Sequence, residues 1–124
     1  MLLKEKHKNI LTSIFSELTI PVEVWAYGSR VTGEAHEGSD LDLVMRTETL
    51  DRVPIDIFLD MKEKILVSRI PIIVELFDWA RLPDSFHKNI EANHEVLFSN
   101  FEIILNEPKD TYGLNRKKND TKDI

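Results

Sequence analysis

A glycine-serine pair and two aspartates are the residues whose types and spacing point most clearly to chemistry. Gly28 and Ser29 are followed, after ten residues, by Asp40 and Asp42, which one leucine separates. Alternate side chains of an extended segment share one face, so the two aspartates are expected on the same side, about 7 Å apart. Carboxylates held together repel unless a cation binds between them, and Mg²⁺ prefers hard oxygen ligands. The pair therefore indicates a divalent metal site.

A third carboxylate is expected on a neighbouring strand, where the segment IIVELFDW contains Glu75 and Asp78. These residues are three positions apart, so they cannot face the same side of a regular strand. Glu75 has apolar neighbours on both sides, where a charge is costly unless it is bound or paired, and we expect it to be the third acid. Asp78, at the end of the strand, remains the alternative. Two metal ions about 3.5–4 Å apart can promote in-line displacement at phosphorus.

The Gly28-Ser29 turn suits a phosphate group. If residues 30–35 begin a short helix, its first free N–H groups point back at the turn and favour an anion there. Gly28 lets the backbone approach a ligand, the Ser29 hydroxyl can donate a hydrogen bond, and Arg30 could add positive charge. Either half of the pattern alone is more often structural. The full arrangement arises by chance in on the order of one chain in a thousand of this length.

Helices and strands that alternate along the chain must position these residues. Apolar residues at helical spacing predict three longer helices, over residues 2–18, 53–69 and 85–98. In the last of them Asp84 is expected to cap the N-terminus, and Phe86, Ile90 and Leu97 to form the apolar stripe. Runs rich in β-branched and aromatic residues predict three strands, over residues 22–27, 41–45 and 72–77. This order predicts an α/β domain with one small sheet.

The composition limits the size and setting of the protein. The 124 residues, 42% of them hydrophobic, allow one compact domain, which we expect over residues 1–105, followed by a polar and mobile tail over residues 106–124. The chain has no cysteine, so it forms no disulfide, and a cytoplasmic setting is the default. No apolar run approaches the roughly 18 residues of a membrane span, so we expect a soluble protein.

The charge argues against a nucleic acid polymer as the main partner. Sixteen basic residues against 22 acidic ones give a net charge of −6, the opposite of what binding to a phosphate backbone favours. A single nucleotide is compatible with this charge, because metal ions can bridge its phosphates to the carboxylates. The charge therefore leaves a single nucleotide possible as a ligand.

The stretch VWAYGSRVTGEAHEGSDLDLVM resembles the signature of the minimal nucleotidyltransferases of the DNA polymerase β superfamily, and the resemblance extends over about residues 2–98. It implies a small mixed sheet flanked by helices, two Mg²⁺ ions, and transfer of a nucleoside monophosphate from an NTP to a hydroxyl with loss of pyrophosphate. Mn²⁺ would bind alike. Many members have Asp where this chain has Glu75. The resemblance assigns Asp40, Asp42 and Glu75 to metal binding and catalysis, and Gly28, Ser29, Arg30 and Ser39 to the nucleotide.

Stand-alone domains of this kind resemble MntA-like antitoxins, which pair with an all-helical HEPN toxin and transfer AMP from ATP to one of its tyrosines. We expect such a partner to complete the site, since one domain has no second lobe for a small acceptor. Two alternatives stay open. The chain could be a binding module without turnover that neutralises a toxin by contact, or an enzyme that modifies a small molecule such as an aminoglycoside. A polymerase role is disfavoured by the acidic charge.

Overall fold

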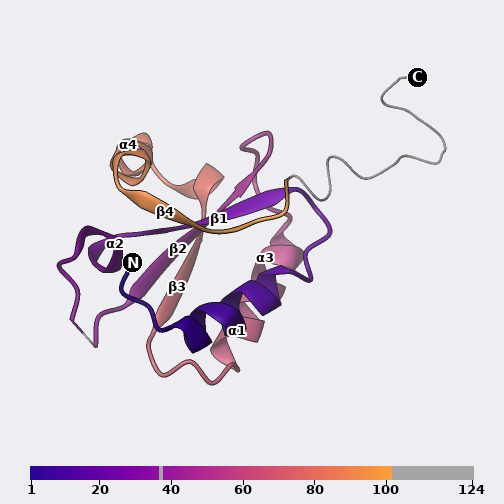
Figure 1. Cartoon of the computed structure of the whole chain (residues 1–124). Coiled ribbons are helices and arrows are strands. Elements are labelled where there is room, and N and C mark those ends of the chain that lie inside the picture. The colour runs from indigo at the N-terminus through magenta and orange to yellow at the C-terminus, as the bar shows by residue number, and fades with distance from the viewer. Residues whose placement is uncertain (37, 102–124) are drawn as a thin grey trace, which may run out of the picture.

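The computed structural model describes residues 1–36 and 38–101, which form one sheet with helices on both faces (Figure 1). The helices are α1 (Glu5–Phe15), α2 (Ser29–Thr32), α3 (Ile55–Leu66) and α4 (Asp84–Ala92), and a 3₁₀ turn, η1, covers Trp79–Arg81. The strands are β1 (Val22–Tyr27), β2 (Leu41–Thr47), β3 (Val74–Asp78) and β4 (His94–Ser99). The tail predicted over residues 106–124 lies outside the described residues. No helix in the described part of the chain is long and apolar enough to cross a bilayer.

The sheet is mixed, as expected, with the strand order β3-β2-β1-β4. Strand β1 is antiparallel to both of its neighbours, β2 and β4, whereas β2 and β3 are parallel. Parallel neighbours need a crossover connection, which α3 provides. The two strands that flank the Gly28-Ser29 turn, β1 and β2, therefore occupy the centre of the sheet, and β3 lies at one edge.

The helix predicted over residues 85–98 is wrong in its second half. Helix α4 ends at Ala92, and His94–Ser99 form strand β4, which pairs with β1. The predicted apolar stripe does not form a single packed face, because Ile90 packs on one face of the sheet, Leu97 joins the core on the other, and Phe86 is 48% exposed. Pairing with the free edge of β1 satisfies the backbone of residues 94–99, which the helical pattern did not anticipate.

Asp84 does not cap α4 as predicted. The N-cap position is occupied by Pro83, no side chain caps the helix by hydrogen bonding, and Asp84 is the first helical residue. An acidic side chain in the first turn still interacts favourably with the helix dipole.

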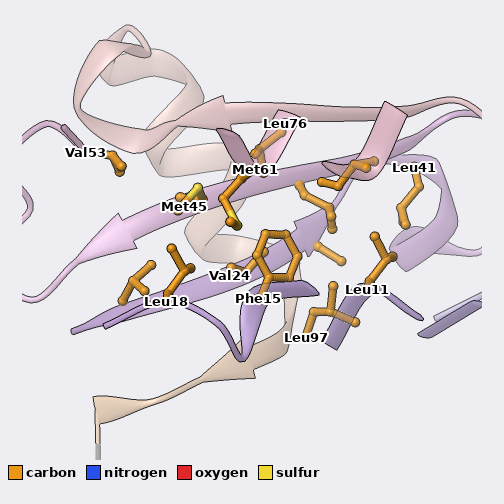
Figure 2. Packing of buried hydrophobic residues seen from close by; sticks show 14 residues of the cluster. Leu11, Phe15, Leu18, Val24, Leu41, Met45, Val53, Met61, Leu76 and Leu97 are labelled. Atoms are coloured by element: carbon orange, nitrogen blue, oxygen red, sulfur yellow. The ribbon is translucent and has the colours of Figure 1, made fainter. Parts of the chain in front are cut away.

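Helices α1 and α3 cover one face of the sheet and form the main core (Figures 1 and 2). Alternate residues of the two central strands point into this core and are fully buried: Val22, Val24, Ala26, Leu41, Leu43 and Met45. Leu11 and Phe15 of α1 and Met61 of α3 pack against them. Burial of each Leu, Val, Phe or Met side chain contributes about 1.5–3 kcal/mol. Since this face takes the apolar residues, Asp42 must point to the other face.

Helix α4 and η1 cover only part of the second face, where an aromatic cluster forms. Trp25, Val44, Trp79 and Ile90 are buried there. The guanidinium carbon of Arg46 lies 3.8 Å from the ring centroid of Trp25 and 4.3 Å from that of Trp79, an arrangement that favours cation–π attraction. Tyr27, the register partner of Asp42, packs against this cluster, so the cluster adjoins the predicted site residues.

Candidate active site

Asp42 and Glu75 lie next to each other on the second face of the sheet. They are register partners on the parallel strands β2 and β3, and Asp42 is also paired with Tyr27 on β1. Side chains of paired residues project to the same face, so Tyr27, Asp42 and Glu75 form a row across three strands. We call these three residues the carboxylate row. Of the two candidates for the third acid, Glu75 is the one that the structure brings beside Asp42.

Partial burial and neighbouring negative charges raise the pKa values of two side chains in the carboxylate row. Burial raises the pKa of Asp42, and the neighbouring charges of Glu75 and Asp40 raise it further. Burial and then the charges of Asp42 and Glu75 raise the pKa of Tyr27 to about 12. No hydrogen bond or salt bridge to the carboxylates of Asp40, Asp42 or Glu75 occurs within the described residues. These groups hold negative charge that a bound cation would neutralise.

Gly28 makes room for Asp42. A Cβ atom placed on Gly28 would lie 2.6 Å from Oδ2 of Asp42, and φ at Gly28 is +83°, in the region that favours glycine. The glycine of the predicted phosphate turn therefore also leaves the space that the carboxylate of Asp42, a candidate metal ligand, occupies.

The carboxylates of Asp40, Asp42 and Glu75 fit a Mg²⁺ site that phosphate groups of the substrate complete. Among residues 1–36 and 38–101 no three His, Cys, Asp or Glu side chains form a group that could hold an ion on their own. Mg²⁺ is usually held by one or two carboxylates together with waters and substrate phosphates, rather than by a cage of protein ligands. Asp42 and Glu75, with the exposed Asp40 just before β2 and near enough for its charge to raise the pKa of Asp42, match that mode of binding.

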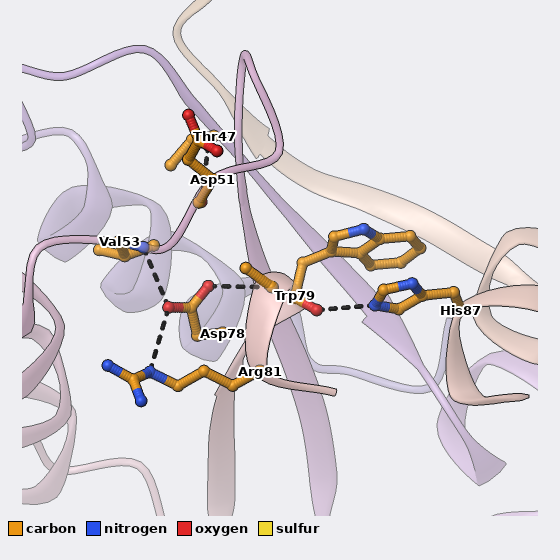
Figure 3. Close-up of polar contacts among 8 residues, drawn as sticks. Thr47, Asp51, Val53, Asp78, Trp79, Arg81 and His87 are labelled. Atoms are coloured by element: carbon orange, nitrogen blue, oxygen red, sulfur yellow. Dashed lines mark hydrogen bonds and ion pairs between the residues drawn. The ribbon is translucent and has the colours of Figure 1, made fainter. Parts of the chain in front are cut away.

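Asp78, the alternative third acid, has a structural environment (Figure 3). It is only 3% exposed, and its carboxylate accepts hydrogen bonds from the backbone N–H groups of Val53, at 3.0 Å, and Ala80, at 3.3 Å. The guanidinium Nε of Arg81 lies 3.6 Å from the same group. Asp78 thus connects the segment before α3 to η1 and points away from the carboxylate row, because it is three residues from Glu75 on the strand.

The phosphate turn is compact. Helix α2 is a single turn, in which Gly28 O accepts the N–H groups of Val31, at 3.0 Å, and Thr32, at 3.1 Å. Ser29 is the first residue of this turn and is partly exposed. Ser29 therefore begins the turn that follows β1, the strand whose last residue, Tyr27, pairs with Asp42.

Arg30 supports the loop before Asp40. The side chain is only 7% exposed; its Nε donates to the backbone O of Ser39 at 2.9 Å, and its Nη1 donates to the backbone O of Leu2. The hydroxyl of Ser39 in turn accepts the N–H of His36 at 3.0 Å. These contacts hold Arg30 and Ser39 in the loop that leads to Asp40, and the nucleotide contact predicted for both residues stays a prediction.

A cavity between α2 and α4 adjoins the carboxylate row and was not predicted. It measures about 410 Å³, and its lining includes Tyr27, Gly28, Thr32, Phe86, Asn89 and Asn93. Tyr27 could have been found from the sequence if the pairing of β1 with β2 had been known, because it lies opposite Asp42. The residues of α4 belong to no motif, and only the fold brings them to the site.

A family model described as "Polymerase beta, Nucleotidyltransferase" matches residues 9–103, a span that includes the phosphate turn and the carboxylate row. The chain belongs to this family. It is a nucleotidyltransferase, and both the predicted family and the predicted fold are confirmed.

Relatives of known name agree with this assignment. A probable protein adenylyltransferase MntA from Haemophilus influenzae is 35% identical over 96 residues, which cover 77% of this chain and 82% of that protein. A crystal structure of a toxin–antitoxin with AMP-PNP superposes with a TM-score of 0.60 at 17% identity, covering 78% of this chain and 79% of the other. The toxin–antitoxin MntA–HepT gives a TM-score of 0.56 at 13% identity, covering 82% and 80%. The two structures establish the shared fold.

Proposed function

We propose that this nucleotidyltransferase transfers AMP from ATP to a hydroxyl group of a partner protein and so acts as an antitoxin. The observation that carries the proposal is the placement of Asp42 and Glu75 side by side, against the Gly28-Ser29 turn. The 35% identical relative, a probable protein adenylyltransferase, supports AMP as the group transferred and a protein as the acceptor.

Each proposed site residue has a role in this reaction. Asp40, Asp42 and Glu75 would hold two Mg²⁺ ions, and Gly28 and Ser29 would hold the triphosphate. Such ions neutralise the phosphates and activate the attacking oxygen. The acceptor oxygen forms a bond to the α-phosphorus, the bond between the α-phosphorus and its bridging oxygen breaks, and pyrophosphate and a proton are released. In this scheme Glu75 is the carboxylate nearest the acceptor.

The position of Glu75 supports a macromolecular acceptor. Glu75 is exposed on β3, the edge strand of the sheet, so a large partner can approach it from the side. The acceptor we propose is a tyrosine of an all-helical HEPN toxin, in keeping with the MntA–HepT complexes that share the fold. We place the reaction in the cytoplasm, where ATP and Mg²⁺ are available.

The test is intact-mass spectrometry of the partner protein that co-purifies with this chain, before and after addition of ATP and Mg²⁺. We expect the partner to gain one or more AMP groups. The variant Asp40→Ala/Asp42→Ala should abolish the gain, whereas Asp56→Ala, which removes an exposed carboxylate from α3, should retain it.

Two results would contradict the proposal. A stable complex whose partner gains no mass would identify a module that neutralises by contact alone. Release of pyrophosphate that depends on a small alcohol such as an aminoglycoside, without any protein acceptor, would identify a small-molecule enzyme.

A further inference from the structure

The cavity between α2 and α4 has the size of a small-ligand site. Its volume of about 410 Å³ falls within the roughly 300–1,000 Å³ typical of such sites. Tyr27 and Gly28 line it at one end, and Phe86, Asn89 and Asn93 of α4 and its C-cap line it at the other. A ligand in this cavity would therefore reach from the carboxylate row to α4.

The α4 side of the cavity offers an aromatic ring and two amides. Phe86 is 48% exposed, although it is a large apolar residue, and exposed aromatic rings form stacking platforms for nucleobases. Asn89, on α4, and Asn93, at its C-cap, both line the cavity. Within the described residues neither amide side chain forms a hydrogen bond. The cavity thus combines a stacking surface with available donors and acceptors.

The opposite side of the cavity connects it to the chemistry. Gly28 lines the cavity and also lies next to the carboxylate of Asp42, which a Cβ atom on Gly28 would meet. Tyr27 lines the cavity and is the register partner of Asp42. A nucleoside whose base lies against α4 would direct its 5′-phosphate toward Asp42, which is where the proposed metal ions must contact it.

We infer that this cavity binds the nucleoside of the substrate and that Asn89 and Asn93 select adenine; the inference rests on the proposed nucleotidyl transfer. An amide presents a donor beside an acceptor. Adenine presents the complementary pair at N6 and N7, whereas guanine presents two acceptors at O6 and N7. A carboxylate in place of the amide loses the donor that adenine needs, and it matches the two donors at N1 and N2 of guanine.

The experiment measures the Kd values of the α,β-methylene analogues of ATP and GTP by calorimetry in the presence of Mg²⁺, because these analogues cannot transfer their nucleoside monophosphate. We expect the wild-type chain to prefer the ATP analogue. Asn89→Asp or Asn93→Asp should reduce the ATP-to-GTP preference by about tenfold or more. Asn89→Gln, which keeps the amide, should retain more of the ATP-to-GTP preference than Asn89→Asp does. Phe86→Ala should weaken both analogues alike, by about tenfold, through loss of stacking.

A matched control separates base recognition from simple charge. Lys88→Gln changes the net charge of α4 by the same amount as each Asn→Asp change, but Lys88 does not line the cavity, so the ratio of the two Kd values should stay at the wild-type value. Unchanged ratios in both Asn→Asp variants, in folded protein, would overturn the inference.

Failure of the inference can be told apart from failure of the proposed function. If the wild-type chain modifies its partner and binds the ATP analogue, yet the Asn89 and Asn93 variants keep the wild-type ratio, only the assignment of base recognition is lost. If the wild-type chain binds neither analogue, the proposed function fails and the inference fails with it.

Discussion

Gly28 and Asp42 are fitted to each other: a Cβ on Gly28 would lie 2.6 Å from Oδ2 of Asp42. The backbone of Gly28, with φ +83° and ψ −159°, lies in a region that is essentially restricted to glycine. The tight turn after β1 and the position of the Asp42 carboxylate therefore both depend on Gly28. A change at Gly28 should alter the chemistry as well as the fold.

Gly28→Ala is expected to abolish AMP transfer and to lower the free energy of unfolding by about 1–3 kcal/mol, because alanine is strained in this conformation and its methyl group displaces Asp42. Gly33→Ala is the matched control: φ at Gly33 is +89°, but a Cβ there would meet nothing within 4 Å. That variant should lose stability and keep its activity per folded molecule. Urea unfolding and intact-mass assays measure the two quantities, and equal losses of activity would show that the contact with Asp42 is unimportant.

Asp42→Asn and Glu75→Gln should each reduce AMP transfer by at least about a hundredfold, because each removes a ligand of the proposed metal ions. The same changes should raise the free energy of unfolding of the metal-free protein near neutral pH, because burial and the charge of Glu75 raise the pKa of Asp42 and so disfavour its charged form. Thermal melting in EDTA measures this gain. A loss of stability in both variants would mean that the two carboxylates serve the fold.

Asp78→Ala should give the opposite result. The backbone N–H of Val53 would lose its acceptor in a buried position, and we expect the free energy of unfolding to fall by about 1–3 kcal/mol. Partner modification by the fraction that remains folded should persist. Comparison with Glu75→Gln at the same temperature then decides between the two candidate acids, and the assignment of Glu75 fails if Asp78→Ala alone is inactive while fully folded.

The elements that were predicted correctly are those whose hydrophobic pattern in the sequence agrees with their burial in the fold. Strand β1 was predicted over residues 22–27 and is observed over Val22–Tyr27, because its alternating residues are buried against α1 and α3 as the pattern requires. Strand β4 was missed, since Ile90 and Leu97 also fit a helical stripe and nothing local indicates that β1 has a free edge. Only the paired sheet decides that the chain leaves the helix after Ala92.

The candidate site was predictable to a similar extent. Asp42 could be placed on one face of a short strand, with Asp40 just before it, and Glu75 could be preferred over Asp78 from its apolar neighbours. The contacts of Arg30 could not be predicted, because the carbonyl groups that it contacts belong to Leu2 and Ser39, far apart in the sequence. Contacts of this kind depend on the path of the backbone, which residue types do not specify.

Arg30→Lys tests whether Arg30 positions the loop or binds the nucleotide. The guanidinium fork reaches two carbonyl groups at once, and an ammonium group at the end of a flexible stem cannot reproduce this geometry. We expect the free energy of unfolding without nucleotide to fall by about 1–2 kcal/mol, whereas Arg69→Lys, a control on an exposed residue, should leave it unchanged. If Arg30 instead held the triphosphate, lysine would preserve the stability of the nucleotide-free protein and chiefly weaken ATP binding. Thermal melting with and without ATP separates these outcomes, because a positioning role lowers the melting temperature in both states and a nucleotide-binding role lowers it only when ATP is present.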